Sequence, residues 1–329
     1  MKTRKLGSTG LDLTELSFGA APIGNLYRPV ERAQAMATLQ AAWEGGIRYF
    51  DTAPFYGQGL SERRVGDFLQ DKPRDSFVLS TKVGRLLEPV TSGPLPDTGY
   101  VGALPFSITY DYSYDGILRS WEDSLQRLGL SSVDILYVHD LEPDSFDAEG
   151  YAAHLDSFSR SGIRALEELK RDGHIKAYGL GVNQVQACLD VMDRVPLDCL
   201  LMAGRHSLLD RSASARLMGL CEQSGTAMVV GGVFNSGILA TGARPGATFN
   251  YHEAPPEIMA RVTEMEAVAA RHDVALATAA LHFPLKSPVV ASVLIGSAKP
   301  ASLTRNFDLF AQDLPEAIWP EMEQHAIFG

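Results

Sequence analysis

Eight short apolar runs, each followed by a longer stretch with helical spacing, predict a (β/α)8 barrel with long loops at its C-terminal face. The runs are almost continuous in Val, Ile, Leu and Tyr, which is typical of parallel strands buried on both faces. No low-complexity linker divides the 329 residues, so we expect one barrel domain over residues 1–329. An open, doubly wound sheet is the alternative. However, the first run continues as GAAPIGNLY and lacks the G-x-G-x-x-G turn of a dinucleotide-binding sheet.

The expected elements alternate regularly along the chain. We expect strands at residues 16–21, 47–53, 77–83, 133–139, 175–183, 199–204, 227–234 and 291–297. We expect helices at residues 30–46, 113–129, 164–173, 184–193, 213–223, 256–272, 276–282 and 300–310. Ser113 is a suitable N-cap, and Gly129 and Gly173 mark the C-terminal ends of two of these helices.

Two segments interrupt this alternation. Residues 85–112 carry prolines at positions 89, 94, 96 and 105, and residues 241–256 carry glycines at positions 242 and 246. Long segments without clear periodicity in a compact domain usually line a binding site. We expect both segments, with residues 205–211, to decide substrate specificity.

Composition and charge exclude several classes of protein. The net charge of −11, without a Lys/Arg run, argues against a nucleic-acid partner. Three cysteines, none in a C-x-x-C pair, argue against a disulfide scaffold or a zinc site, and we expect no metal. No signal peptide and no apolar stretch of about 20 residues is visible, so we expect a cytoplasmic protein without a membrane segment.

Four ionisable residues lie at or just after the ends of three consecutive expected strands: Asp51, Tyr56, Lys82 and His139. Each alone has a structural explanation, such as a helix cap, a surface lysine, a buried histidine or a packing aromatic. Strand ends converge on one face of a barrel, however, so together the four indicate one site. An isolated tyrosine has a pKa of about 10, and a neighbouring ammonium favours its phenolate form. The set suits proton transfer at a carbonyl or hydroxyl group.

Two glycine-rich stretches follow the last two expected strands. The first is GGVFNSG, with Gly232, Phe234 and Gly237, and the second begins with Gly296 and Ser297. Barrels commonly bind phosphate with the loops after strands seven and eight. These loops are therefore candidate phosphate-binding sites for a cofactor that accepts or donates a hydride.

The motifs FDTAPFYG, STKVG and YVHD resemble those of the aldo-keto reductase superfamily, and the resemblance extends from RKLGSTGLDLTELSFGAAPIG to IGSAKPASLTRN. This resemblance implies a barrel that binds a nicotinamide cofactor without a Rossmann domain. It implies that Tyr56 is the general acid/base, that Lys82 lowers the pKa of Tyr56, and that Asp51 pairs with Lys82 near the nicotinamide ribose. It also implies that His139 orients the substrate oxygen.

Residues 110–140 resemble a narrower branch, the D-threo-aldose, L-fucose and L-galactose dehydrogenases, and pyridoxal 4-dehydrogenases are similar. The branch implies a small sugar or aldehyde substrate and oxidation of an aldose at C1 to a lactone. A pyridoxal 4-dehydrogenase, a general NADPH-dependent aldehyde reductase and a cofactor-binding regulatory subunit stay open as alternatives. The sequence leaves the sugar and the oligomeric state open.

The resemblance also assigns cofactor contacts. It implies that Asn183 contacts the nicotinamide amide and that His206 stacks on the nicotinamide in place of the family's usual aromatic residue. With the chain aligned on Gly296 and Asn306, the positions that grip a 2′-phosphate in NADP-binding members read Gly296 and Ser302, and neither is basic. Lys299 and Arg305 lie nearby and can substitute. We therefore favour NAD over NADP, with either possible.

Overall fold

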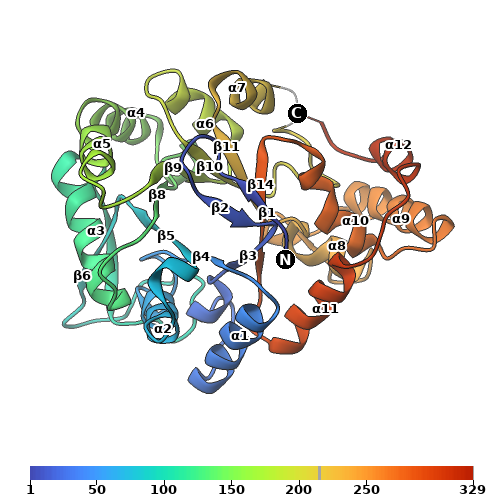
Figure 1. Ribbon diagram of the computed structural model, residues 1–329, viewed down its shortest axis with the longest axis horizontal. Coiled ribbons are helices and arrows are strands. Elements are labelled where there is room, and N and C mark those ends of the chain that lie inside the picture. The colour runs from blue at the N-terminus through green and yellow to red at the C-terminus, as the bar shows by residue number, and fades with distance from the viewer. Residues whose placement is uncertain (214–215, 329) are drawn as a thin grey trace.

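Eight parallel strands close into a barrel in the order β10-β11-β14-β3-β4-β5-β8-β9, surrounded by helices (Figure 1). The computed structural model describes residues 1–213 and 216–328. All eight expected strands form, although most are shorter than expected. They are β3 (Leu16–Gly19), β4 (Tyr49–Asp51), β5 (Val78–Val83), β8 (Ile135–His139), β9 (Ala177–Val182), β10 (Cys199–Ala203), β11 (Ala227–Gly231) and β14 (Val290–Gly296).

The expected helices also form, within a few residues of their predicted ends. They are α1 (Arg32–Glu44), α3 (Tyr114–Leu128), α5 (Ile163–Arg171), α6 (Val185–Met192), α7 (Arg216–Ser224), α9 (Pro256–Arg271), α10 (Leu276–His282) and α11 (Pro300–Phe310). Of the helix expected at 213–223, residues 214 and 215 lie outside the described residues. Four helices were not expected: α2 (Leu60–Leu69), α4 (Ala148–Ser157), α8 (Ile238–Thr241) and α12 (Ile318–Glu323).

The ends of α3 show why the sequence places it correctly. The Ser113 hydroxyl accepts a hydrogen bond from the backbone N–H of Gly116 at 3.2 Å, which satisfies one of the free N–H groups of the first turn. Gly129 adopts the left-handed conformation after the last turn, with φ of 65°. In the described part of the chain, no helix combines the length and apolar character needed to cross a membrane.

A short hairpin closes the N-terminal end of the barrel. Its strands are β1 (Thr3–Lys5) and β2 (Asp12–Thr14), and it lies in front of the barrel in Figure 1. Leu6, Leu11 and Leu13 belong to the same buried cluster as Tyr49 and Ile135 from the barrel interior. This end of the barrel interior is therefore filled by apolar side chains.

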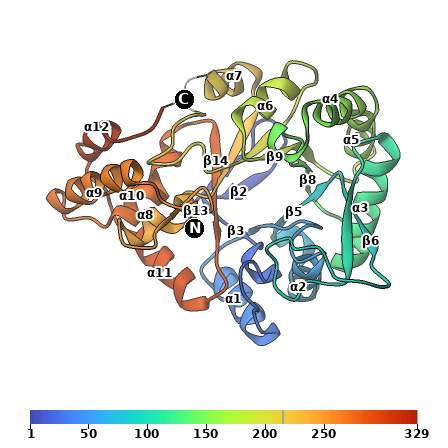
Figure 2. The same ribbon diagram turned by 180° about the vertical axis from the view of Figure 1, so that it is seen from behind.

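Both interrupting segments contain short antiparallel strands, which sequence periodicity did not reveal. Residues 85–112 form β6 (Arg85–Pro89) and β7 (Phe106–Tyr110), and residues 241–256 form β12 (Thr248–Phe249) and β13 (His252–Glu253). Figure 2 shows the second pair over the barrel from behind. The strands are too short, and too broken by proline and glycine, for alternation to be detected.

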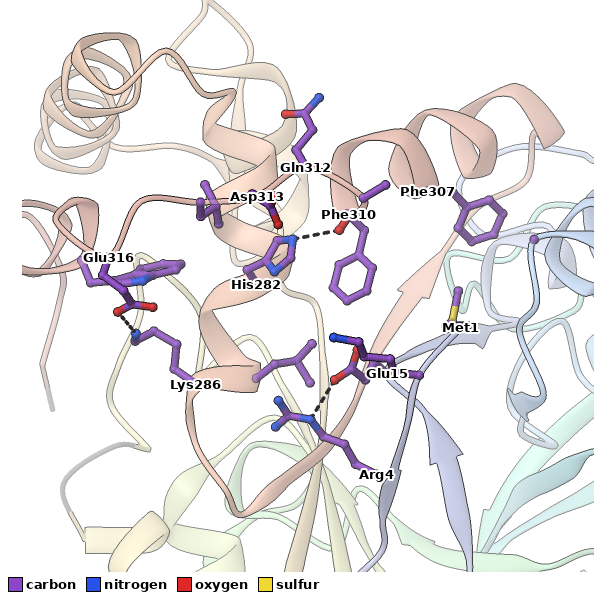
Figure 3. Close-up of a pocket in the computed structure, with 16 residues that line it drawn as sticks. Met1, Arg4, Glu15, His282, Lys286, Phe307, Phe310, Gln312, Asp313 and Glu316 are labelled. Atoms are coloured by element: carbon purple, nitrogen blue, oxygen red, sulfur yellow. Dashed lines mark hydrogen bonds and ion pairs between the residues drawn. The ribbon is translucent and has the colours of Figure 1, made fainter.

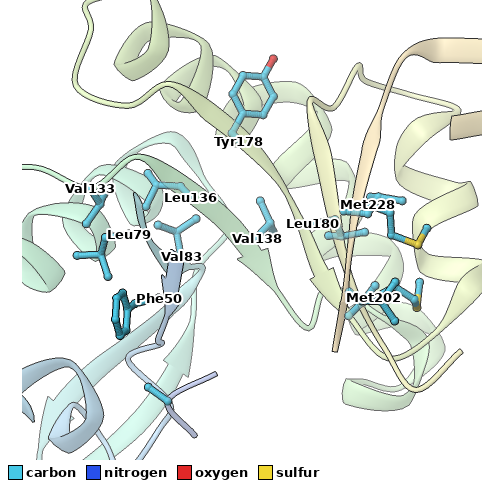
Figure 4. Packing of buried hydrophobic residues seen from close by; sticks show 14 of the residues in the cluster. Phe50, Leu79, Val83, Val133, Leu136, Val138, Tyr178, Leu180, Met202 and Met228 are labelled. Carbon is cyan, nitrogen blue, oxygen red and sulfur yellow. The ribbon is translucent and has the colours of Figure 1, made fainter. Parts of the chain in front are cut away.

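Alternation along each barrel strand separates the outer core from the interior. Phe50, Leu79, Leu136, Val138 and Leu180 point outward and pack against the helices (Figure 4). The residues between them in sequence point into the barrel. This alternation places the polar residues of β4, β5 and β8 inside.

Candidate active site

The interior face of three neighbouring strands carries a stack of polar side chains. Tyr49 and Ser80 form its lower layer, where the Tyr49 hydroxyl lies 2.9 Å from the Ser80 hydroxyl and 3.2 Å from that of Tyr137. The Ser80 hydroxyl in turn donates to Asp51 Oδ1 at 2.7 Å. Because a charged group needs hydrogen bonds when it is buried, this layer supports the charges directly above it.

Asp51 and Lys82 form a buried ion pair above this layer. Lys82 Nζ donates to Asp51 Oδ2 at 2.6 Å and to the carbonyl oxygen of Thr52 at 2.9 Å. The Asp51 carboxylate is 1% exposed and the Lys82 side chain 2% exposed. Burial raises the pKa of Asp51, and the Lys82 ammonium opposes that rise. Removing either partner would leave an uncompensated charge.

Tyr56 lies between Lys82 and His139. Lys82 Nζ is 4.6 Å from the centre of the Tyr56 ring, and the ring of His139 is 5.9 Å away at an interplanar angle of 86°. The turn that carries Tyr56 is held by a close backbone approach. A Cβ atom on Gly57 would lie 2.3 Å from the carbonyl oxygen of Gly24, and Gly57 has a positive φ of 67°. Glycine is therefore required next to Tyr56.

The pKa of Tyr56 is raised well above its ordinary value. Burial is the largest cause, followed by the negative charges of Asp51 and Asp140, while Arg85 opposes them. The Lys82 ammonium is already bound to a carboxylate and a carbonyl group. The phenol is accordingly a proton donor at neutral pH in this form of the protein.

His139 is held neutral in the same pocket. Burial lowers its pKa well below the ordinary value, and the positive charges of Arg85 and Lys82 act in the same direction. The backbone carbonyl of His139 accepts a hydrogen bond from the Tyr112 hydroxyl at 2.7 Å, which fixes the end of β8. A neutral imidazole can donate one hydrogen bond to a substrate oxygen without carrying charge.

A cavity of about 350 Å³ opens above these residues at the C-terminal end of the barrel. Tyr56, Lys82, His139 and Asn183 line it, whereas Asp51 lies beneath its floor. Both interrupting segments contribute, as expected for specificity loops. The other lining residues include Ala21, Leu26, Tyr27, Phe55, Thr98, Gly99, Tyr100, Asp140 and Tyr251.

Asp140 and Arg85 are charged residues near this cavity that the sequence did not single out. Asp140 lines the cavity, and its carboxylate is ion-paired with Arg85 NH2. Asp140 Oδ2 also lies 3.6 Å from His139 Nε2. The only sequence signal was position: Asp140 follows the strand-end histidine directly, and Arg85 follows STKVG.

Asn183 lies in the cavity wall, where it was expected. Its backbone N–H donates to Glu142 Oε2 at 2.7 Å, and its side-chain Nδ2 donates to Glu142 Oε1 at 3.2 Å. Both bonds use nitrogen atoms of Asn183. The side-chain oxygen, Oδ1, can therefore accept a hydrogen bond from a carboxamide N–H group. The donor and acceptor set at this point of the wall therefore fits the amide of a nicotinamide.

His206 does not line the cavity, so the expected stacking on a nicotinamide is not supported. The residue is 6% exposed, and its ring packs against that of Phe283 with a centroid distance of 5.3 Å. Burial lowers the pKa of His206 to about 4, and Arg211 acts in the same direction. Beyond His206, the loop after β10 packs into the apolar cluster around α9 and α10 through Leu208 and Leu209.

The expected phosphate-binding residues follow or end β11 and β14, neighbouring strands in the barrel, and three of them lie in α11: Ser302, Arg305 and Asn306. Gly232, Phe234 and Gly237 follow β11, and Gly232 and Gly237 adopt positive φ angles of 64° and 105°. Ser297 and Asn306 are buried, whereas Gly296, Lys299, Ser302 and Arg305 are exposed. The Arg305 guanidinium donates to the carbonyl oxygen of Ala240 at 3.3 Å. Exposed backbone N–H groups in the glycine turns and at the N-terminus of α11 suit the binding of a pyrophosphate.

A second cavity lies outside the barrel mouth, between the N-terminus, α10 and α11 (Figure 3). Its volume is about 690 Å³, larger than that of the cavity around Tyr56. Four of its charged side chains form ion pairs: Arg4 with Glu15 at 3.1 Å and Lys286 with Glu316 at 2.9 Å. We place the active site in the smaller cavity because the proton-transfer residues converge there.

The sequence matches the model of the Aldo/keto reductase family over residues 15–327. The chain belongs to the aldo-keto reductase family. It is 43% identical over 336 aligned residues to a pyridoxal 4-dehydrogenase of Microbacterium luteolum, covering 99% of this chain and 98% of that protein. It is 39% identical over 322 aligned residues to a D-threo-aldose 1-dehydrogenase of a Pseudomonas species, covering 96% and 95%. This chain is therefore an oxidoreductase of the aldo-keto reductase type.

The fold is also similar to that of solved aldo-keto reductases. The holo form of an aldo-keto reductase from Bacillus halodurans superposes with a TM-score of 0.76 at 26% sequence identity, covering 99% of this chain and 97% of that chain. The predicted family and the predicted (β/α)8 barrel are both confirmed. A nicotinamide nucleotide is the cofactor of the family, and the choice between NAD and NADP stays a prediction.

Proposed function

We propose that this aldo-keto reductase oxidises an aldose at C1 to the lactone, with NAD or NADP as hydride acceptor and Tyr56 as general acid/base. The observation that carries the proposal is the buried Asp51–Lys82 pair directly beside Tyr56, with His139 on the other side of the phenol in the same cavity. This set can move one proton to or from a substrate oxygen, and it offers no nucleophile that would serve hydrolysis.

The protein residues divide the proton transfer between them. His139 donates a hydrogen bond to the substrate oxygen, and the phenolate form of Tyr56 accepts the proton of the anomeric hydroxyl. The Lys82 ammonium stabilises the phenolate, and Asp51 keeps that ammonium charged and in place. As the C1–O bond becomes a carbonyl, the hydrogen on C1 leaves with its electron pair. When bound, the nicotinamide supplies the acceptor for that hydride.

The cofactor would lie across the C-terminal edge of the barrel. Asn183 would hold the nicotinamide amide next to Tyr56, and the loops with Gly232, Gly237 and Gly296 would hold the pyrophosphate. We favour NAD because the two aligned positions for a 2′-phosphate are not basic and because Arg305 already bonds to α8. Lys299 is the exposed cation that can still reach such a phosphate.

Pyridoxal is the second candidate substrate, favoured by the relative at 43% identity that is named a pyridoxal 4-dehydrogenase. The aromatic wall formed by Tyr27, Phe55, Tyr100 and Tyr251 suits a flat ring as well as the apolar face of a sugar. The two candidates share a chemical form. Pyridoxal carries a hydroxymethyl group beside its aldehyde and closes to a cyclic hemiacetal, and oxidation of a cyclic hemiacetal gives a lactone for either substrate.

The test is an assay for reduced nicotinamide at mildly alkaline pH, with NAD or NADP and with L-fucose, L-galactose, D-arabinose or pyridoxal added separately. Turnover of one sugar that Tyr56→Phe reduces by about 10²- to 10⁴-fold, with cofactor affinity unchanged, supports the proposal. Turnover of pyridoxal alone selects the second candidate. If only aldehyde reduction occurs, the protein is a general aldehyde reductase. Cofactor binding without turnover in either direction would favour a regulatory subunit.

A further inference from the structure

We propose that Asp140 recognises the hydroxyl group on the carbon next to the reacting carbon of the substrate, and that Arg85 behind it keeps the carboxylate oriented. This inference rests on the proposed function and adds a residue that selects hydroxylated substrates. In the (β/α)8 frame, Asp140 follows the last residue of β8 and Arg85 begins β6, so two different segments meet at this point of the cavity.

Asp140 is within reach of the neighbouring substrate oxygen. Its Oδ2 atom lies 3.6 Å from His139 Nε2, the atom that can point to the reacting oxygen. Oxygens on adjacent carbons of a sugar are close together, so a substrate held by His139 presents its next hydroxyl toward Asp140. A carboxylate accepts hydrogen bonds and donates none, so the group it recognises must be a donor.

Arg85 supports the carboxylate from outside the cavity. It is 6% exposed, and its guanidinium carbon lies 4.2 Å from the centre of the Phe55 ring and 5.1 Å from that of Tyr110. Its Nε atom is buried without a hydrogen-bond partner among residues 1–213 and 216–328. The guanidinium is thus fixed by two aromatic rings and by the Asp140 carboxylate.

The arrangement is costly if it serves only the fold. Burying an ion pair contributes little to stability compared with apolar side chains of similar size. Asp140 also has a positive φ of 46°, in the left-handed region that aspartate adopts more readily than most residues other than glycine. A largely buried ion pair in a cavity wall is typical of a binding role, because it holds a charged group in place for a ligand.

Charge also decides what approaches Asp140. Lys82, the other fully charged side chain in the cavity wall, is neutralised by Asp51. The Asp140 carboxylate accepts hydrogen bonds and donates none, so it suits a hydroxyl group of the substrate and not the oxygens of a cofactor phosphate. Tyr100 and Phe55 flank the same region, which provides an apolar surface beside one acceptor, as a sugar ring requires.

The test compares substrates that differ only in that hydroxyl. Removal of the 2-hydroxyl from D-arabinose gives 2-deoxy-D-ribose, so kcat/KM is measured for both sugars with wild type and with Asp140→Asn. We expect the ratio of kcat/KM for D-arabinose to that for 2-deoxy-D-ribose to fall by about 10- to 100-fold in the variant, mainly because kcat/KM for D-arabinose falls. This is the size of effect that follows from the loss of one hydrogen bond to a charged group. Asp144→Asn is the matched control, because Asp144 is exposed four residues further along the chain.

Equal losses for both sugars, or an unchanged ratio, would overturn the proposal. The double variant Asp140→Asn/Arg85→Gln guards against misfolding, because it leaves no unpaired buried guanidinium, and it must show the same fall in the ratio. If L-fucose or L-galactose is the sugar that wild type oxidises, the same comparison is made with that sugar and its 2-deoxy form; if wild type oxidises no aldose, the proposed function fails. The role of Asp140 is then judged by the ratio of kcat/KM for reduction of glyceraldehyde to that for reduction of propanal. A ratio that falls in Asp140→Asn supports the role, and a constant ratio overturns it.

Discussion

The two halves of the barrel mouth are built in different ways. On the side of β4, β5 and β8, charged side chains are buried and bonded to one another before any ligand arrives, as in the Asp51–Lys82 pair. On the side of β11 and β14, the candidate site consists of glycine turns, exposed side chains and the N-terminus of α11. The difference teaches that chemistry requires fixed charges, whereas a phosphate can be held by backbone groups of many sequences.

The largest effect should follow from breaking the buried ion pair. Lys82→Met leaves Asp51 uncompensated, so we expect the free energy of unfolding to fall by about 3–5 kcal/mol. We expect kcat/KM to fall by about 10²- to 10⁴-fold, because the phenolate of Tyr56 loses its cation. Urea unfolding and steady-state kinetics measure the two effects.

Adding Asp51→Asn to the Lys82→Met variant separates stability from chemistry. The double variant has no unpaired buried charge, so most of the lost stability should return while activity stays low. Recovery of both would show that Lys82 serves the fold and has no part in proton transfer.

The next effect concerns the turn that holds Tyr56. Gly57→Ala would place a Cβ atom 2.3 Å from the carbonyl oxygen of Gly24, in addition to the strain of φ at 67°. Gly129→Ala has the same strain, with φ of 65°, but no atom within 4 Å of the added Cβ. We expect Gly129→Ala to lose about 1 kcal/mol of stability and no activity per folded molecule. Gly57→Ala should lose more stability and most of its kcat. Similar kinetics for the two would mean that the position of this turn is not critical.

The pH dependence of oxidation should respond to Asp140. The negative charges of Asp140 and Asp51 raise the pKa of Tyr56, and oxidation requires the phenolate form. Removing one negative charge lowers that pKa, so the rising limb of kcat/KM against pH should move to lower pH in Asp140→Asn. The falling limb for carbonyl reduction should move in the same direction. A shift of either limb to higher pH would contradict the assignment of Tyr56 as the proton-transfer group.

The smallest effect should occur on the phosphate side. Lys299 and Arg305 are exposed, and Arg305 already bonds to the carbonyl oxygen of Ala240, so we expect at most a weak and salt-sensitive attraction to a 2′-phosphate. We expect Lys299→Ala/Arg305→Ala to raise the KM for NADP by about two- to fivefold at low salt. The KM for NAD is the internal control and should stay constant. An equal rise for both cofactors would place these residues at the shared pyrophosphate instead.

Much of the fold and part of the site could be predicted from the sequence, for physical reasons. Strands such as β8 are buried on both faces, so their apolar runs are visible, and residues at their ends must converge. The roles of Arg85 and Asp140 were not visible, because a charged residue in a turn is usually solvated. The surroundings of His206 were not visible either, because its packing against Phe283 is a contact between distant parts of the chain.

The β6–β7 hairpin suggests how substrate choice can diverge without loss of the reaction. The base of this hairpin lies beside the catalytic residues. Arg85 is the first residue of β6 and Tyr110 the last residue of β7, and the two pair with each other, with the Arg85 guanidinium packed on the Tyr110 ring. Its far part returns to the cavity at Tyr100, which pairs with Leu26. Residues 91–97 between these anchors are exposed. Insertions, deletions and grafts from relatives can therefore accumulate in this stretch while the anchors keep the proton-transfer geometry unchanged, which makes it the natural place to start when redesigning the enzyme.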